Sequence, residues 1–265
     1  MISKIITFLL KPFFGRSWTQ NLFKFIHYIG LRGMHYGQGA FVGESGERYV
    51  IQFVKNQASG KLVLFDIGGN IGKYSVLLND IIPQNRIIHA FEPSKITAEK
   101  FRETTNGIHD IVLNNCGLSD ASGELELFYD TETSGLSSLY QRDLKHANIN
   151  MSKSEKIHLQ RLDDYCINNK IEEIDLLKID VEGHELAVLK GCGKMLEDRR
   201  IKFIQFEFGG CNIDSRTYFK DFFNLLNPDY KIYRIIHNDI VEMKSYSELN
   251  EIFTTVNYFA ALRSL

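Results

Sequence analysis

The sequence lacks the features that would place it at once in a specialised class. It has no excess of charge, since 31 Lys and Arg oppose 33 Asp and Glu in 265 residues and leave a net charge of −2. A general nucleic-acid binder needs a strong basic excess on one face, so no nucleic-acid partner is expected. Proline is scarce at 4 residues, and no Pro-rich or Ser-rich linker or internal repeat divides the chain. The composition predicts an ordinary globular protein with one large domain.

Cysteine pairs are also missing. Cys116, Cys166, Cys192 and Cys211 are scattered, with no C-x-x-C pair and no His at zinc-ligand spacing. This pattern argues against a disulfide framework and against a structural zinc site. Four reduced, mostly buried thiols are typical of a cytoplasmic protein.

Long hydrophobic runs are absent from the N-terminus. In MISKIITFLLKPFFGR only six residues separate Lys4 from Lys11, far fewer than the roughly 20 that span a bilayer, and no signal-peptide pattern is present. Basic residues interleave with Phe and Trp as far as residue 25, which would suit a peripheral helix at the inner face of a membrane. A helix packed on its own domain is the favoured interpretation.

The remaining sequence predicts two parts. Residues 1–58 have the pattern of a helix, a glycine-punctuated loop and a short strand near RYVIQF, which indicates an N-terminal cap packed on the main domain. In residues 59–265, short apolar runs such as KLVLFDI, RIIHAFE, EIDLLKID and IKFIQFEF alternate with segments of helical period. Strands and helices in this order predict a doubly wound, mostly parallel α/β sheet.

Two segments interrupt this alternation. In SDASGELELFYD, a Ser-Gly turn precedes alternating Leu and Glu, which predicts an inserted antiparallel strand with one wet face. The long polar stretch that follows, from about residue 131, predicts a functional loop that could cover a binding site.

The stretch LFDIGGNIGKY, residues 64–74, places a glycine-rich turn at the end of a predicted strand. Open parallel sheets bind ligands beyond these strand ends. A dinucleotide site would need G-x-G-x-x-G to cradle a pyrophosphate, whereas the spacing here is D-x-G-G-N-x-G. The carboxylate of Asp66 would repel a pyrophosphate but attract an ammonium group. S-adenosylmethionine, a nucleoside with a sulfonium, an amino acid and no phosphate, has this character.

Glu92 ends the next predicted strand, twenty residues beyond Gly72. A carboxylate there can accept hydrogen bonds from both hydroxyls of a ribose. Either feature alone is common, and Glu92 could simply end a strand in water. Because the two occur in order on successive strands, together they predict a site for S-adenosylmethionine.

Seven stretches resemble the FkbM-type methyltransferases, a branch of the class I S-adenosylmethionine-dependent enzymes. They are FDIGGNIGKYS, AFEPS, GLSDASGELELF, QRLDDY, DLLKIDVEGHELAVLKG, IQFEFGG and NYFA. The resemblance covers about residues 45–262 and implies a seven-stranded sheet with one antiparallel strand. Gly69 stands where the family often has Ala, which should loosen the turn slightly. By position, the resemblance implies that the methionine end of the cofactor meets Asp66, Gly68, Asn70 and Tyr74, the ribose meets Glu92, and the adenine meets Asn115.

The chemistry is expected at the end of a further buried strand, in KIDVEGHE. Asp180 and Glu182 should face the same crevice as the turn, since alternate residues of a strand share a side. Asp180, Glu182, His184 and the inward-facing Glu207 are the candidates for the base that takes the acceptor's proton. Glu182 could instead cap the following helix, and His184 could simply be exposed.

Asp180, Glu182 and Glu207 also offer oxygen ligands that could hold Mg²⁺. The spacing does not specify a coordination geometry, so a divalent metal is a weaker alternative to a metal-free site. The favoured function is transfer of a methyl group to a hydroxyl of a sugar or glycan, as in surface-polysaccharide assembly. The alternatives are an NAD(P)-dependent oxidoreductase on the same type of sheet and a non-catalytic binding module.

Overall fold

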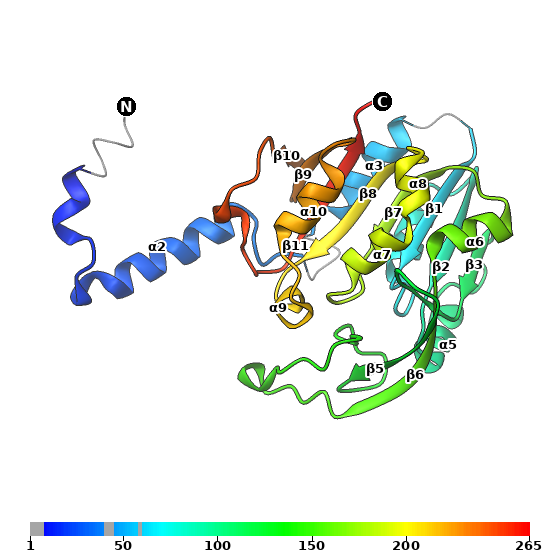
Figure 1. Cartoon of the computed structure of the whole chain (residues 1–265), viewed down its shortest axis with the longest axis horizontal. Helices are drawn as coiled ribbons and strands as arrows, with labels where there is room; N and C mark the ends of the chain where they lie inside the picture. Colours follow the sequence, from blue (N-terminus) through cyan, green and yellow to red (C-terminus); the bar gives the residue numbers. More distant parts are fainter. Residues whose placement is uncertain (1–7, 40–44, 58–59) are drawn as a thin grey trace.

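The computed structural model describes residues 8–39, 45–57 and 60–265. Its centre is a sheet in the strand order β10-β9-β11-β8-β7-β1-β2-β3, with helices on both faces (Figure 1). The strands are β1 (Leu62–Ile67), β2 (Arg86–Phe91), β3 (Ile111–Asn114), β7 (Ile174–Ile179), β8 (Ile201–Phe208), β9 (Tyr230–Ile236), β10 (Asp239–Glu242) and β11 (Val256–Leu262).

The directions of the strands confirm the predicted doubly wound, mostly parallel sheet. The strands β3, β2, β1, β7 and β8 pair in parallel, and β11 lies antiparallel between β8 and β9. These seven strands correspond to the expected number, and β10 adds an eighth at the edge. It forms a tight hairpin with β9, in which only His237 and Asn238 separate the paired Ile236 and Asp239. Two-residue turns of this kind join antiparallel strands efficiently.

Side chains on the two faces of the sheet form two hydrophobic cores. Leu64 and its neighbours on one face pack with α3 (Glu47–Gln57) and α4 (Lys73–Ile81). Phe65, one residue later, belongs to the opposite core with α6 (Leu162–Asn169), α7 (Glu185–Gly191), α8 (Gly193–Glu197) and α10 (Phe219–Leu226). The alternation along β1 therefore divides the two layers, as expected for a doubly wound sheet.

The prediction of a strand near RYVIQF is wrong, because this segment lies within α3. Val50, Ile51 and Val54 are each at most 1% exposed and share one face of the helix, which packs against α4. A short apolar run does not distinguish a strand from a buried helix. The contact with α4 decides between them here.

The predicted inserted antiparallel strand is confirmed. It is β5 (Gly123–Tyr129), which pairs antiparallel with β6 (Lys153–Gln160) in a separate sheet completed by β4 (Gly117–Leu118). This small sheet lies below the carboxyl ends of the main strands in Figure 1. The connection between β5 and β6, residues 130–152, is the long polar segment and is called the 130–152 loop below. The small sheet and the 130–152 loop cover the carboxyl ends of the central strands.

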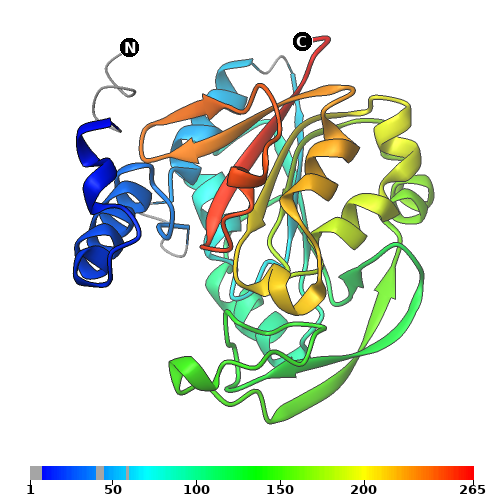
Figure 2. The ribbon, with the colours of Figure 1, turned by 60° about the vertical axis from the view of Figure 1, so that its left-hand side comes forward.

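The N-terminal segment extends away from the sheet (Figures 1 and 2). It consists of two short 3₁₀ turns and the helix α2 (Gln20–Gly33), in which no residue is buried. The predicted boundary at residue 58 falls where residues 58–59 lie outside the described residues, so it stays a prediction. Within the described parts of the chain, every helix is too short or too polar to cross a bilayer.

Candidate active site

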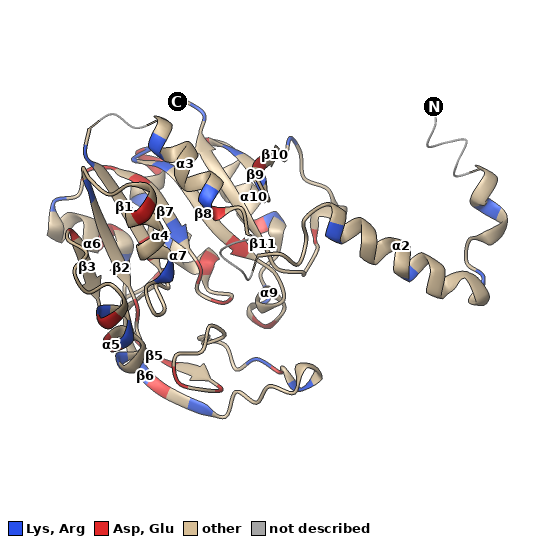
Figure 3. Cartoon of the chain, turned by 180° about the vertical axis from the view of Figure 1, so that it is seen from behind, with Lys and Arg blue, Asp and Glu red and all other residues tan. Residues whose placement is uncertain are grey.

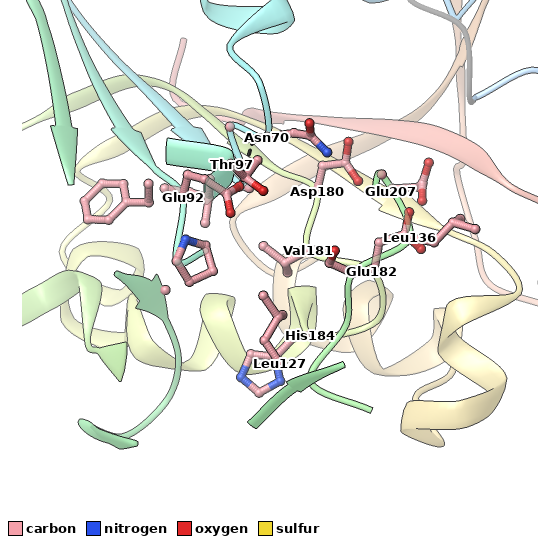
Figure 4. Close-up of a pocket in the computed structure, with 18 of the residues that line it drawn as sticks. Asn70, Glu92, Thr97, Leu127, Leu136, Asp180, Val181, Glu182, His184 and Glu207 are labelled. Atoms are coloured by element: carbon pink, nitrogen blue, oxygen red, sulfur yellow. Dashed lines mark hydrogen bonds between the residues drawn. The ribbon is translucent and has the colours of Figure 1, made fainter. Parts of the chain in front are cut away.

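The central strand ends open into a cavity of about 490 Å³. Its floor comes from the ends of β1, β2, β7 and β8, and its cover from the small sheet and the 130–152 loop (Figure 4). The strand order reverses between β1 and β7, since β2 and β3 lie on one side of this pair and β8 on the other. Open α/β sheets bind their ligands at such a reversal. The cavity is therefore our candidate active site.

The glycine-rich turn after β1 is packed tightly between its neighbours. Gly68 has φ of 76°, and a Cβ added there would lie 1.8 Å from the carbonyl oxygen of Asp180. Only glycine allows the ends of β1 and β7 to approach this closely. The amides of Gly68 and Gly69 both donate to the carbonyl oxygen of Phe91 at the end of β2. The turn is thus held against both neighbouring strands and exposes its backbone to the cavity.

Asp66 is fully buried and lies behind the turn rather than in the cavity wall. Its Oδ2 accepts a hydrogen bond of 2.8 Å from the hydroxyl of Ser75 on α4. Its Oδ1 has no hydrogen-bond partner among the described residues and faces the Nζ of Lys178 at 3.4 Å. The structure does not bring Asp66 into the cavity wall, and its predicted contact with the methionine end of the cofactor stays a prediction.

Lys178 connects the acids of two adjacent strands. Its ammonium lies 3.4 Å from Asp66 and 3.3 Å from Oδ2 of Asp180, and 5.0 Å from the centre of the Tyr74 ring. Burial opposes its charge, but Asp180 and Asp66 raise the pKa of Lys178 above its ordinary value. The lysine is therefore charged and offsets both carboxylates. Tyr74 lines the cavity, and its hydroxyl donates to Gln205 on β8.

The line of buried polar side chains that includes Tyr74 and Gln205 continues to Glu47 at the start of α3. Gln205 donates from Nε2 to Oε1 of Glu47 at 2.9 Å, and Ser45 donates to the other oxygen of Glu47. Burial raises the pKa of Glu47. Each buried polar side chain in this line has a partner, as burial requires. These hydrogen bonds hold the start of α3, and the part of the cavity wall that it forms, against the sheet.

Glu92 lies at the end of β2 and lines the cavity. Its two carboxylate oxygens accept hydrogen bonds from the backbone amides of Ser94, at 2.9 Å, and Asn70, at 3.0 Å. Burial outweighs these bonds and raises the pKa of Glu92 to about 7. Each oxygen keeps a further lone pair that can accept from a ligand hydroxyl. The glycine turn, this pair of oxygens and the cavity volume fit the ribose and methionine parts of S-adenosylmethionine.

The two asparagines predicted at the cofactor have different positions. Asn70 lines the cavity with φ of 46°, and its amide donates to the carbonyl oxygen of Ser134 in the 130–152 loop. Asn115 is outside the cavity wall, because its amide donates to the carbonyl oxygens of Glu92 and Pro93. It ties the ends of β2 and β3 together. Its predicted contact with adenine therefore stays a prediction.

The predicted catalytic acids gather on the opposite side of the cavity (Figure 4). Asp180 is 38% exposed and pairs with Lys178. Glu182 accepts a 2.6 Å hydrogen bond from Arg142 of the 130–152 loop. Burial and the charge of Asp180 raise the pKa of Glu182 to about 8, despite the arginine.

Glu207, at the end of β8, differs from these acids. It is 7% exposed, and its carboxylate has no hydrogen bond or ion pair with any described residue. Burial, followed by the charges of Asp180 and Glu182, raises the pKa of Glu207 well above its ordinary value. A buried, unpaired carboxylate that faces a cavity is a strong candidate for proton transfer.

The three oxygen ligands considered for Mg²⁺ do not assemble as a set. The group that comes together is Glu182, Glu207 and Cys211, with ligand atoms within 4.8 Å of one another. Glu182 is already paired with Arg142, and burial raises the pKa of the Cys211 thiol, which disfavours the thiolate that binds metal. Asp180 instead faces Lys178. The donor set does not fit an oxygen-only magnesium site.

His184 is buried, so the alternative of an exposed histidine is wrong. Its Nε2 lies 2.9 Å from the hydroxyl of Ser119, and its Nδ1 lies 3.1 Å from the hydroxyl of Tyr140. Burial lowers the pKa of His184 to about 4, which leaves the ring neutral at pH 7. The turn before α7 is capped by Glu185, whose carboxylate accepts from the amides of Val181 and Gly183, and not by Glu182.

The 130–152 loop is tied to the 182–184 turn by three side chains. The hydroxyl of Ser138 donates to the carbonyl oxygen of Glu182 at 2.7 Å. Arg142 pairs with the carboxylate of the same glutamate, and the hydroxyl of Tyr140 contacts His184. These contacts hold the loop over the acidic side of the cavity, which encloses the space where an acceptor would lie.

Sequence reasoning missed Lys178, Arg142 and Glu47. A signal for Lys178 was present, because a lysine inside the apolar run DLLKID cannot face solvent from a central strand and must pair with a buried acid. Arg142 and Glu47 had no clear signal, since the partners that bring them to the site, Glu182 and Gln205, lie 40 and 158 residues away in the chain.

One family model and three known proteins are similar to this chain in sequence. The family model described as the methyltransferase FkbM domain matches residues 66–234. "Methyltransferase 1" of Beauveria bassiana (strain ARSEF 2860) is 30% identical over 144 residues, which cover 48% of this chain and 57% of that protein. The hexuronic acid methyltransferase AglP of Haloferax volcanii is 25% identical over 165 residues, covering 62% of this chain and 64% of AglP. The 2-O-methyltransferase NoeI of Sinorhizobium fredii is 25% identical over 154 residues, covering 54% of this chain and 63% of NoeI. The matches thus span less than two thirds of each relative.

Proposed function

Because the chain belongs to the FkbM family of methyltransferases, we propose that it transfers a methyl group from S-adenosylmethionine to a hydroxyl of a sugar or glycan. The family match includes both the glycine-rich turn and the acidic side of the cavity, since it runs from residue 66 to residue 234. It argues against the alternatives of an NAD(P)-dependent oxidoreductase and a non-catalytic module.

The sugar acceptor is supported by two relatives. AglP carries the name of a hexuronic acid methyltransferase, and NoeI that of a 2-O-methyltransferase. The cavity of about 490 Å³ has the size of a small-molecule site, and its walls mix apolar and polar side chains.

The cofactor would lie between the glycine turn and Glu92. The carboxylate of Glu92 accepts from the two ribose hydroxyls, and the backbone of Gly68 and Asn70 borders the methionine part. Asp180 is the exposed member of the Lys178 pair and can attract the ammonium group of the methionine part. The bound cofactor supplies a methyl group on a positively charged sulfur.

The single observation that carries the catalytic assignment is the unpaired carboxylate of Glu207. The other acids of the site are already engaged by Lys178, by Arg142 or by backbone amides, so each has a partner within the protein. Glu207 is buried beside the cavity without such a partner among the described residues. A carboxylate whose pKa is raised is a stronger base once ionised, and a sugar hydroxyl needs a strong base. Glu207 therefore takes the proton of the acceptor hydroxyl, while Glu182 and Arg142 shape the acceptor side of the cavity.

The test replaces Glu207 with glutamine, which matches the neutral form of the side chain in size and should leave the fold intact. The variant is expected to bind S-adenosylmethionine with unchanged affinity by calorimetry, but to lose about 10² to 10⁴-fold in kcat. Activity is followed by mass spectrometry on a panel of glycosides and uronic acids, in which one methyl group adds ~14 Da for CH₂. Glu197→Gln, an exposed glutamate on α8, is the matched control.

Two results would contradict the proposal. Wild-type kcat in Glu207→Gln would remove this residue from the chemistry. Labelled methyl groups that appear on nitrogen, or on protein or RNA, in a cell extract, and never on a sugar, would remove the proposed acceptor.

A further inference from the structure

The N-terminal arm, residues 8–34, has an apolar face that no other described part of the chain covers. Residues Leu22, Phe25, Ile26 and Ile29 follow the spacing i, i+3, i+4, i+7 and so lie on one side of α2. Their exposed fractions are 57%, 61%, 52% and 51%. In an ordinary surface helix such a stripe is buried against the core. Here Figures 1 and 2 show the helix projecting from the body of the molecule.

The turns that precede α2 extend this apolar surface. Phe8 and Trp18 are 75% and 72% exposed, and Phe13 and Phe14 are 42% exposed each. Exposed aromatic side chains of this density are unusual on a free protein surface, and contiguous apolar patches mark interaction sites. Tryptophan and phenylalanine are also the side chains favoured at the boundary between lipid and water.

The charge of the arm identifies the partner. Residues 1–43 contain five Lys and Arg and no Asp or Glu, whereas residues 44–265 contain 26 Lys and Arg and 33 Asp and Glu. Figure 3 shows basic but no acidic segments along α2. Lys24 is on the face of α2 opposite the apolar stripe, and Lys11 and Arg16 precede the helix. An apolar face with basic residues around it is complementary to an anionic lipid surface.

A second copy of the chain is a poorer match for this face. Two paired arms would place two basic segments side by side, because residues 1–43 contain five Lys and Arg and no acidic residue to offset them. The length of α2 is also informative, because 14 residues of helix measure about 21 Å and fall short of the ~30 Å hydrocarbon core. A helix of this length lies in the interface rather than across it.

We propose that the N-terminal arm binds the surface of an anionic membrane, with α2 parallel to the bilayer and its Leu22, Phe25, Ile26 and Ile29 face among the acyl chains. The acidic body stays in water, repelled by the same surface that attracts the arm. The enzyme is then a peripheral membrane protein, and its cavity works next to a lipid surface.

The protein carries its own probe for this binding. Trp18 is the single tryptophan of the chain and lies in the arm, so its fluorescence reports on the arm alone. Full-length protein is mixed with vesicles of phosphatidylcholine and phosphatidylglycerol at 7:3 (about one anionic lipid in three). We expect a blue shift of the Trp18 emission and flotation of the protein with these vesicles. Pure phosphatidylcholine, or about 0.5 M salt, should weaken binding at least about tenfold, because the attraction is largely electrostatic.

Two sets of variants separate the contribution of the apolar face to membrane binding from that of the basic residues. Phe25→Glu with Ile29→Glu should abolish flotation, and Lys11→Glu with Lys24→Glu should weaken it about tenfold or more. Leu249→Glu alters an 85% exposed leucine on the body and should bind vesicles like wild type. All variants should keep their activity on a soluble acceptor.

Three results would overturn the proposal. The first is wild-type protein that stays unbound at all lipid compositions, and the second is Phe25→Glu with Ile29→Glu floating like wild type. The third is a dimer in analytical ultracentrifugation that the same double substitution dissociates, since that would assign the apolar face to a second copy.

Discussion

Replacement of Lys178 by methionine should destabilise the protein more than any loss of a surface ion pair. Methionine has a similar length and no charge, so the change removes the ammonium without opening a large cavity. Asp66, which is fully buried, then keeps Ser75 as its one hydrogen-bond or ion-pair partner among the described residues. Asp180 is 38% exposed and can be hydrated instead. The penalty therefore falls on Asp66.

The size of the effect follows from that burial. Loss of one partner from a buried ion pair costs about 3–5 kcal/mol, because the other charge stays buried without compensation. For a chain of this length, each kcal/mol lowers the melting temperature by about 2–4 °C, so Lys178→Met should lower it by roughly 6–20 °C. The free energy of unfolding is measured by urea denaturation followed by circular dichroism, which monitors the sheet and helices of the body.

Two further variants make this prediction specific. The double variant Asp66→Asn with Lys178→Met should lose less free energy of unfolding than the two single variants together, by about 1 kcal/mol or more, since the neutral amide no longer needs the lysine. Lys100→Met removes an exposed pair with Glu103 and should leave the unfolding midpoint unchanged. A loss below about 1 kcal/mol in Lys178→Met, or strict additivity in the double variant, would refute the assigned role of the lysine.

Four other predictions concern ionisation and metals. The pKa of Glu92 is raised to about 7, and ribose hydroxyls donate to its ionised form, so calorimetry should show S-adenosylmethionine binding more tightly as pH rises from 6 to 8. Glu92→Gln should bind the cofactor weakly, with an affinity that does not change over this pH range. Because the pKa of Glu92 rises from 4.5 to about 7 on folding, the folded protein binds more protons than the unfolded chain between these pH values. The cofactor-free protein should therefore lose stability as pH rises from 4.5 to about 7. Melting curves of Glu92→Gln should lack this loss. His184 is neutral, with a pKa lowered to about 4, so His184→Gln should reduce kcat/KM without moving the limbs of its pH profile; a lost limb near pH 6.5 would make the ring a base. Treatment with EDTA should leave turnover unchanged, because Glu182 is paired with Arg142 and Asp180 with Lys178; activity restored by Mg²⁺ would contradict this.

Much of the fold was predictable because it depends on local periodicity. Short apolar runs followed by helical patterns identified β1, β2, β7 and β8 in order, and the inserted strand β5 was evident from its alternation of Leu and Glu. The errors occurred where local pattern is ambiguous. RYVIQF is apolar enough for a strand, and only its contact with α4 makes it a helix.

The sequence by itself determined which residues end the central strands, and therefore that Asp66, Glu92, Asp180 and Glu207 lie near one edge of the sheet. Only the tertiary structure decided what each acid does there, because their partners are distant in the chain and burial depends on the layers around them. Lys178 reaches Asp66 from a strand 112 residues later, Arg142 arrives from an inserted loop, and Glu207 is left without a partner among the described residues. Strand ends follow from local hydrophobic pattern, whereas the protonation and pairing of a carboxylate follow from the assembled surroundings.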